Sequence, residues 1–219
     1  MYGCALCIRE EIYASDHPMV LATKNNIAQV YASEERYDEA ISLFETVIRE
    51  YCENSTEDSA FLAAVYDNLS TAYREMERYE DAIDICTEGL NIRKNIYGKR
   101  SLDYAISLNN LALIYYEMGI LNNAADIFSE ALAIKKETLP EIHGQISIGY
   151  FNLGLVYDKL HRDNEALENY RASMEIDNEL EAYEDVLLTA EYIAEIYERN
   201  DMPEDAEAYR TLCSKDDVH

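Results

Sequence analysis

The sequence predicts an all-α fold in which pairs of antiparallel helices stack as a repeat array. Within similar segments along the chain, apolar residues are spaced by three and four positions, which places them on one face of a helix. These segments follow one another at intervals of 42, 42, 42 and 40 residues and begin at Asn25, Asp67, Asn109, Phe151 and Glu191. Only 7 Gly and 3 Pro occur in 219 residues, and so few turn residues argue against a many-stranded β fold.

Each repeat is interpreted as a first helix, a short polar link and an antiparallel second helix, and one such pair cannot bury its apolar face without neighbours. Leu6–Tyr13 align with Leu90–Tyr97 in the second helix of a later repeat, and residues 1–17 are assigned to one segment on this basis. They predict a lone helix, either a cap or a piece of a longer array, and its apolar residues favour the piece. The five repeats and a short tail are expected at 18–55, 56–98, 99–140, 141–180, 181–213 and 214–219. Proline in a first turn and glycine past a helix end predict boundaries at Pro18, Pro140, Pro203, Gly98 and Gly119.

The composition narrows the classes of partner. The chain carries 44 Asp and Glu against 18 Lys and Arg, a net charge of −26, so nucleic acids and anionic membrane surfaces are not expected as partners. It has no apolar run long enough to span a bilayer and no secretory signal pattern.

Five cysteines, an odd number, fit the reduced thiols of a cytoplasmic protein better than a disulfide framework. Cys4 and Cys7 form an isolated C-x-x-C, which we interpret as small apolar residues on a helix.

Three positions recur in all five repeats. The first helix carries a small residue and, three positions later, a tyrosine, and the second helix carries an alanine. The tyrosines are Tyr31, Tyr73, Tyr115, Tyr157 and Tyr197, and the alanines are Ala40, Ala82, Ala124, Ala166 and Ala206. This pattern resembles the tetratricopeptide (TPR) repeat, and its length, greater than the usual 34 residues, resembles the kinesin-light-chain type. The resemblance implies a right-handed superhelical solenoid of about 11 helices and a protein-binding scaffold.

A row of asparagines precedes the first apolar position of four repeats, at Asn26, Asn68, Asn110 and Asn152. Asparagine is a poor residue for a helix interior because its amide competes for the backbone. The resemblance implies that this position faces the concave groove, where an amide can bond the backbone of an extended peptide. The alternative is that each amide bonds a neighbouring helix and sets the stacking. Further groove residues expected from the same register are Asn25, Asn109, Leu113, Tyr116, Ile148, Phe151 and Leu155.

No catalytic pattern, phosphate-binding loop or zinc motif is found, so we expect no enzymatic activity, no cofactor and no metal site. The four histidines are far apart along the chain, at His17, His143, His161 and His219. We expect a protein or peptide partner with apolar anchors and basic residues, because the chain is strongly acidic. The alternative function is a structural spacer or self-association array within a larger multidomain or signalling protein. Homo-oligomerisation through the N-terminal helix is compatible with either function.

Overall fold

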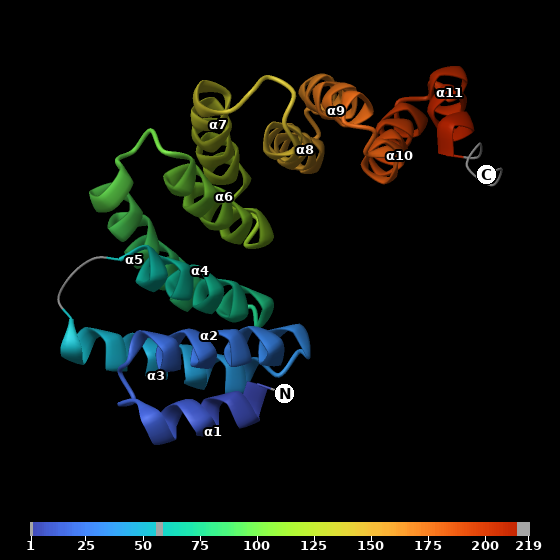
Figure 1. Cartoon of the computed structure of the whole chain (residues 1–219). Coiled ribbons are helices and arrows are strands. Elements are labelled where there is room, and N and C mark those ends of the chain that lie inside the picture. The colour runs from blue at the N-terminus through green and yellow to red at the C-terminus, as the bar shows by residue number, and fades with distance from the viewer. Residues whose placement is uncertain (1, 56–58, 214–219) are drawn as a thin grey trace. The chain divides into compact units, whose positions relative to one another are not determined.

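The computed structural model describes residues 2–55 and 59–213, and in this part of the chain it contains eleven α-helices and no β-strand (Figure 1). The helices are α1 (Tyr2–Ile12), α2 (Pro18–Ser33), α3 (Tyr37–Asn54), α4 (Ala60–Glu75), α5 (Tyr79–Tyr97), α6 (Leu102–Glu117), α7 (Leu121–Thr138), α8 (Gly144–Lys159), α9 (Asp163–Glu179), α10 (Tyr183–Arg199) and α11 (Pro203–Cys213). The predicted all-α class is therefore confirmed. The expected tail at 214–219 lies outside the described residues.

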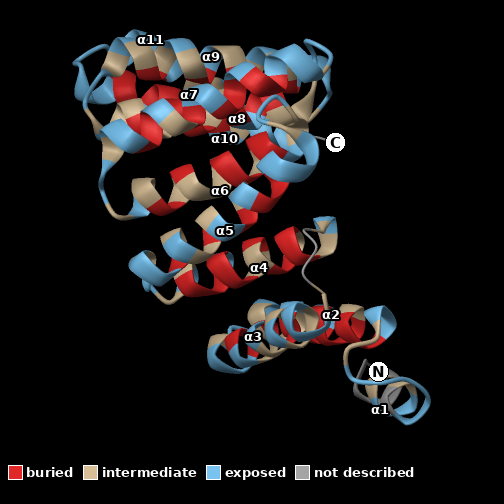
Figure 2. Ribbon diagram, turned by 90° about the vertical axis from the view of Figure 1, so that its left-hand side faces the viewer, coloured by how far each residue is buried: buried red, intermediate tan, exposed pale blue. Residues whose placement is uncertain are grey.

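The chain divides into two compact units, residues 1–114 and 115–219, with the boundary inside α6. In the first unit, α2 packs on α3 and α4 packs on α5, while α3 joins the two pairs by packing on α4. In the second unit, α8 packs on α9 and α10 packs on α11, while α9 packs on α10. Each unit thus repeats the arrangement of a first helix, a second helix and the next first helix. Figure 2 shows the buried residues as stripes along the helices, as helical periodicity requires.

The core is built from the recurring small residues and the larger residues that face them. The recurring alanines of the second helices are almost fully buried, and so are the side chains four positions later, Phe44, Cys86, Phe128 and Tyr170. Gly154 shows why a small residue is needed in the first helix: a Cβ there would lie 2.5 Å from Cδ1 and Cε1 of Tyr170. The close approach of α8 to α9 therefore depends on the missing side chain.

All five first helices end in the same turn. The N–H three residues past the helix end donates to the carbonyl oxygen of the recurring tyrosine at 2.9–3.0 Å, the six-to-one bond of a Schellman motif. The residue before that N–H has a positive φ in every turn, at Glu35, Glu77, Gly119, His161 and Asp201. In three turns an arginine then stacks on the tyrosine ring, with Arg36 over Tyr31 at 4.1 Å. The tyrosine therefore recurs for its ring as well as for its position on the helix.

The structure corrects one predicted boundary. Pro18 and Pro203 begin α2 and α11, and Gly98 and Gly119 lie past helix ends with φ of 79° and 76°, all as predicted. The prediction that Pro140 begins a helix is wrong, because α8 begins at Gly144. A proline disfavours helical conformation in the residue before it, so Pro140 terminates α7.

Candidate functional site

In the first unit, a pocket lies on the surface formed by the first helices of the repeats, which we call the first-helix surface. Its volume is about 320 Å³, and α2, α3 and α4 line it with Gln29, Ala32, Tyr37, Phe44, Asn68, Thr71, Ala72 and Glu75. Asn68 belongs to the asparagine row, and Gln29 and Thr71 lie three positions after the row in their own repeats. The pocket offers amide, hydroxyl and carboxylate groups beside an aromatic wall.

The asparagine row bonds across repeats in the first unit. Asn68 Nδ2 donates a hydrogen bond to Asn25 Oδ1 at 3.2 Å, which joins α4 to α2. Asn110 donates to the carboxylate of Asp67, which joins α6 to α4. In both cases the row residue of one repeat bonds the residue just before the row in the preceding repeat. These two bonds support the interpretation that the amides help to set the stacking of the first helices.

The members of the row differ in accessibility. Asn26 is exposed, and its side chain makes no hydrogen bond to the part of the chain that the structure describes. Asn68 and Asn110 are half-buried, whereas Asn25 and Asn152 are buried. Asn109 and Asn152 both interact with other protein groups. The row is therefore open to a ligand at Asn26, partly open at Asn68 and Asn110, and closed at Asn152.

Asp67 also belongs to a buried polar network that sequence reasoning missed. Arg93 of α5 forms an ion pair with Asp67 and donates a hydrogen bond to Ser107 of α6. Ser107 Oγ donates to Asp67 Oδ1 at 3.2 Å. Burial raises the pKa of Asp67, while Arg93 and the hydrogen bonds from Ser107 and Asn110 act in the opposite direction. The network connects three helices, so it fixes the geometry that the first-helix surface depends on.

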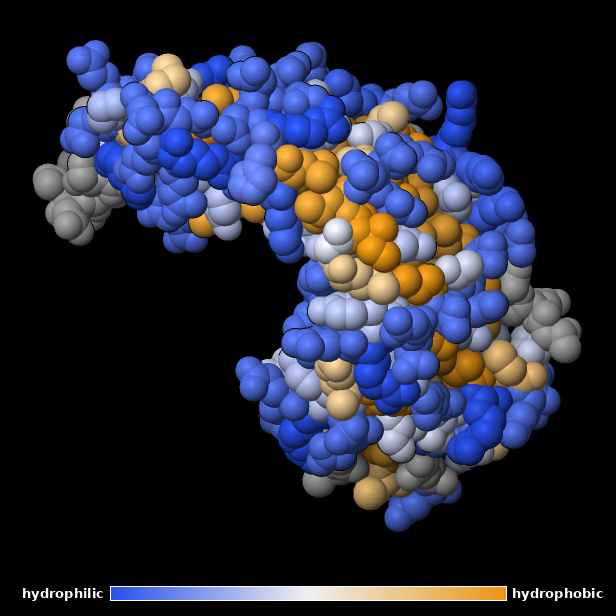
Figure 3. All heavy atoms as spheres, turned by 180° about the vertical axis from the view of Figure 1, so that it is seen from behind, coloured by the Kyte–Doolittle hydropathy of each residue, from blue (hydrophilic) through white to orange (hydrophobic). Residues whose placement is uncertain are grey.

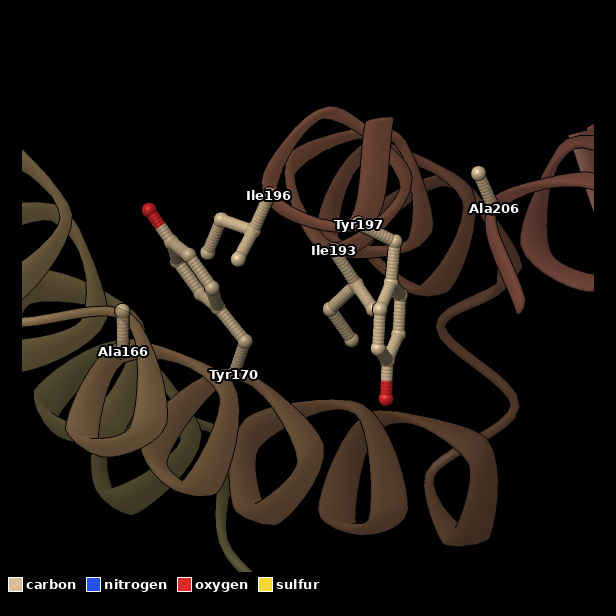
Figure 4. Packing of buried hydrophobic residues seen from close by; sticks show 6 residues of the cluster. All are labelled: Ala166, Tyr170, Ile193, Ile196, Tyr197 and Ala206. Atoms are coloured by element: carbon tan, nitrogen blue, oxygen red, sulfur yellow. The ribbon is translucent and has the colours of Figure 1, made fainter. Parts of the chain in front are cut away.

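Aromatic residues form part of the core of the second unit. Phe151, Tyr170 and Tyr192 pack with ring centroids 5.4–5.5 Å apart, and Leu155 packs against the same cluster. Figure 4 shows Tyr170 of α9 beside Ile193 and Ile196 of α10, and these three belong to one core cluster. The predicted groove residues Phe151 and Leu155 are therefore half-buried and stabilise the unit.

The remaining predicted groove residues are partly or largely accessible. Ile148 has 53% of its surface exposed. Tyr116 is half-buried, and Lys159 Nζ lies 4.5 Å from the centre of its ring. Leu113, in the first unit, is also half-buried. Figure 3 shows a surface that is mostly hydrophilic, with apolar side chains gathered in a few patches. Exposed apolar side chains of this kind are candidates for ligand contact.

A second pocket on the first-helix surface, which we call the Asp177 pocket, lies between α8, α9 and α10. Its volume is about 190 Å³, and its lining residues are Gly144, Ser147, Ile148, Phe151, Ser173, Asp177, Leu180, Ala182, Asp185, Leu188 and Thr189. Ser147 Oγ and Ser173 Oγ are 2.8 Å apart, and Ser173 Oγ donates to Asp177 Oδ2 at 3.4 Å. Of the predicted groove residues, Ile148 and Phe151 line this pocket.

A larger pocket of about 630 Å³ lies between α7, α8 and α9, outside the predicted groove. Three glutamates, one lysine and several apolar residues line it: Lys136, Glu141, Ile142, Ile146, Tyr150, Ala172, Glu175, Ile176 and Glu179. Lys136 Nζ donates to Tyr150 Oη at 2.8 Å. This pocket borders the 139–143 link, next to the start of α8, which the sequence pattern placed incorrectly at Pro140.

Within the described residues, no group of three or more histidine, cysteine, aspartate or glutamate side chains could hold a metal ion. His17 and His143 instead cap helices, since the Nδ1 atom of each accepts a hydrogen bond from the backbone N–H two residues later, at 3.1–3.2 Å. In the same part of the chain, no helix has the length and apolar character needed to cross a membrane.

Family models described as tetratricopeptide repeat match residues 20–54, 61–137 and 149–180, together about two thirds of the chain. BtubC (BKLC) from P. vanneervenii is similar in structure, with a TM-score of 0.86, 19% identity and coverage of 100% of this chain and 90% of that chain. A putative kinesin light chain from Podosopora anserina with nearly identical TPR-like repeats has a TM-score of 0.77 at 19% identity and covers 90% and 95%. The Rap conjugation gene regulator of plasmid pLS20, in complex with the Phr* peptide, has a TM-score of 0.69 at 18% identity and covers 89% and 53%. No curated protein sequence matches.

Proposed function

Because the chain belongs to the tetratricopeptide repeat family, we propose that it is a non-enzymatic scaffold that binds an extended peptide or partner segment on its first-helix surfaces. The observation that carries the proposal is the pocket between α2 and α4. It contains Asn68 together with Gln29 and Thr71, three polar residues at the register positions where the sequence pattern places ligand contacts. Side-chain amides and hydroxyls can bond a peptide backbone without reading its sequence.

The structural neighbours support a peptide as the type of ligand. The Rap regulator of plasmid pLS20 shares this fold and was solved with the Phr* peptide. In the present chain the second unit adds apolar contacts, since Ile148 is largely exposed beside the half-buried Phe151. The first unit therefore suits backbone bonding to a ligand, and the second unit suits contact with apolar anchors.

The charge of the chain favours basic ligands. The net charge is −26, and both first-helix pockets contain a carboxylate, Glu75 in one and Asp185 in the other. Long-range attraction of this kind accelerates encounter with a cationic partner more than it strengthens the final complex. We therefore propose a partner segment with apolar anchors and lysine or arginine residues, encountered in the cytoplasm.

Selection from a random-peptide phage library on the purified chain tests the proposal, with affinities of the selected peptides measured by fluorescence polarisation. Asn26→Ala is the informative variant, because Asn26 is exposed and is not needed for hydrogen bonds to described residues. Asn91→Ala, at an exposed position of the second helix α5, is the matched control. We expect Asn26→Ala to weaken binding severalfold, about the effect of one hydrogen bond, and Asn91→Ala to have no effect. Failure to enrich any peptide would refute the proposal.

A structural or self-association role is the second candidate, and one observation favours it. Ile8 and Ile12 of α1 are 57% and 65% exposed, which is unusual for two isoleucines on one short helix. Self-association through α1 would cover them. Sedimentation of the parent chain and of Ile12→Asp tests self-association: a dimer that the substitution dissociates supports it, and a monomer at all concentrations excludes it.

A further inference from the structure

One position of the second helices carries a buried charge that changes sign along the chain. Arg93 of α5, Lys135 of α7 and Asp177 of α9 are 42 residues apart, and all three are buried. Arg93 has an internal counter-charge, because it forms an ion pair with Asp67. Asp177 introduces a negative charge at the position where the two preceding repeats carry a positive one.

Asp177 has no cationic partner in the described part of the chain. Its exposed fraction is 5%, and the groups that bond it are the hydroxyls of Ser147 and Ser173. Neither Asp177 nor Asp185 forms an ion pair with a described lysine, arginine or histidine. Burial raises the pKa of Asp177, and the nearby carboxylate of Asp185 raises it further. A buried carboxylate without a counter-charge is unfavourable, so a cation between the two would stabilise both.

The Asp177 pocket has the size and lining for one long cationic side chain. Its volume of about 190 Å³ equals that of about six water molecules at roughly 30 Å³ each. Ile148, Leu180 and Leu188 are all more than 40% exposed and line the same pocket as the two carboxylates. Aliphatic walls beside an acidic end match the chemistry of lysine and arginine, whose apolar stems pack on apolar surface while the charged end bonds a polar group.

We propose that the Asp177 pocket binds one lysine or arginine side chain of the partner segment, with the ammonium or guanidinium group between Asp177 and Asp185. This inference rests on the proposed function, and it assigns the basic residue of the ligand to one place. The neighbouring Ile148 and Leu188 would contact the residues that flank the basic side chain. Charged groups at such a site set specificity, because a neutral ligand would leave the carboxylates desolvated and unpaired.

The probe is an acetylated and amidated Leu-Lys-Leu tripeptide, titrated into the isotopically labelled chain while amide chemical shifts are recorded by NMR. We expect saturable shifts at Gly144, Ile148 and Leu188. The analogue with norleucine in place of lysine keeps the aliphatic chain without the charge, and it is expected to bind about tenfold more weakly, the loss of one charge-assisted hydrogen bond. Leu-Arg-Leu is expected to bind the same residues.

Asp185→Asn and Asp177→Asn are the test variants, and each is expected to reduce tripeptide affinity about tenfold. Glu184→Gln is the matched control, because it removes one negative charge from an exposed position adjacent to Asp185 but outside the pocket lining. It should leave the affinity unchanged within twofold at physiological salt, where exposed charges are screened. Asp185 is exposed, so Asp185→Asn remains a valid test even if Asp177→Asn unfolds.

The outcomes separate this inference from the proposed function. Peptides selected on the phage library that bind equally well with lysine, arginine or norleucine would leave the scaffold proposal intact and overturn the pocket assignment. Shifts confined to other surfaces, or no shift at millimolar tripeptide, would also overturn it. Absence of any peptide ligand would overturn both proposals. Equal losses in Asp185→Asn and Glu184→Gln would show a general effect of net charge and refute the specific site.

Discussion

Two glycines of α8 allow the close contact between α8 and α9 to be tested, because one glycine serves as the control for the other. Gly149 and Gly154 are both buried in the interior of the same helix. A Cβ at Gly154 would lie 2.5 Å from two ring carbons of Tyr170, whereas a Cβ at Gly149 would lie 2.9 Å from Cδ1 of Leu132. The leucine methyl group can move by a rotation of its own side chain. The tyrosine ring is fully buried, so it cannot.

Gly149→Ala and Gly154→Ala gain the same helix propensity, but they differ in the cost of packing the added methyl group. Replacing a helical glycine by alanine increases helix stability by about 1 kcal/mol, equally at both positions. Forcing a methyl group into a packed core costs about 1–3 kcal/mol, and we expect this at Gly154, because Phe151 and Tyr192 hold the Tyr170 ring at centroid distances of 5.5 Å. Gly149→Ala should be neutral or stabilising by up to about 1 kcal/mol, and Gly154→Ala should be less stable than Gly149→Ala by about 1–3 kcal/mol.

Urea denaturation followed by far-ultraviolet circular dichroism measures this difference. Repeat arrays can unfold in steps, so the two variants should be compared at the same resolved transition. Combining Gly154→Ala with Tyr170→Leu should recover part of the loss, because the smaller side chain makes room for the methyl group. If Gly154→Ala proved as stable as Gly149→Ala, the packing of α8 on α9 would not depend on the absent side chain.

Three further predictions follow from backbone geometry and burial. Glu77 has a φ of 57°, so Glu77→Gly should raise the free energy of unfolding by about 1 kcal/mol, and an unchanged urea midpoint would contradict this. Cys86 is fully buried and its pKa is raised to about 12 by burial. In the folded chain, iodoacetamide should therefore modify exposed Cys7 far faster than Cys86, as mass spectrometry of the peptides would show. Burial raises the pKa of Asp177, so its stabilising contribution is complete below its ordinary pKa and is lost as pH rises through the folded-state value. Asp177→Asn should therefore become more stable than the parent chain as pH rises above about 4, measured by urea midpoints.

The helices and their core could be predicted because both follow from a local period. Spacings of three and four residues define a buried stripe wherever they occur, and Ala40 and Phe44 show this directly. The turns were predicted less well. The glycine at position 119 indicates a positive φ. Glu35 and Glu77 adopt the same conformation, although glutamate gives no such indication. Their conformation is imposed by the bond to the tyrosine carbonyl and by the neighbouring repeat, which outweigh the local preference of glutamate.

The candidate site was less predictable, because its chemistry depends on pairs from different helices. Asn68, a candidate from the register, lines a pocket, but the register could not identify Asn25 as the acceptor of the Asn68 amide. It also gave no indication that Arg93 would reach Asp67. Such partners are far apart in sequence and meet only when the stacking is known. A polar residue at a position that is otherwise apolar, such as Arg93 or Asp177, is the signal that could have located these networks.

Stacking and ligand binding are compatible roles for the same amide. A primary amide has two N–H donors and a carbonyl oxygen with two lone pairs, and Asn68 uses one donor on Asn25. One donor and the carbonyl oxygen then remain for a ligand, and the bond to Asn25 fixes the plane in which they lie. An amide that is already oriented loses less conformational entropy when a ligand binds. The bond between α2 and α4 therefore prepares Asn68 for binding, and the choice between a structural and a functional row of asparagines depends on how much of each amide stays open.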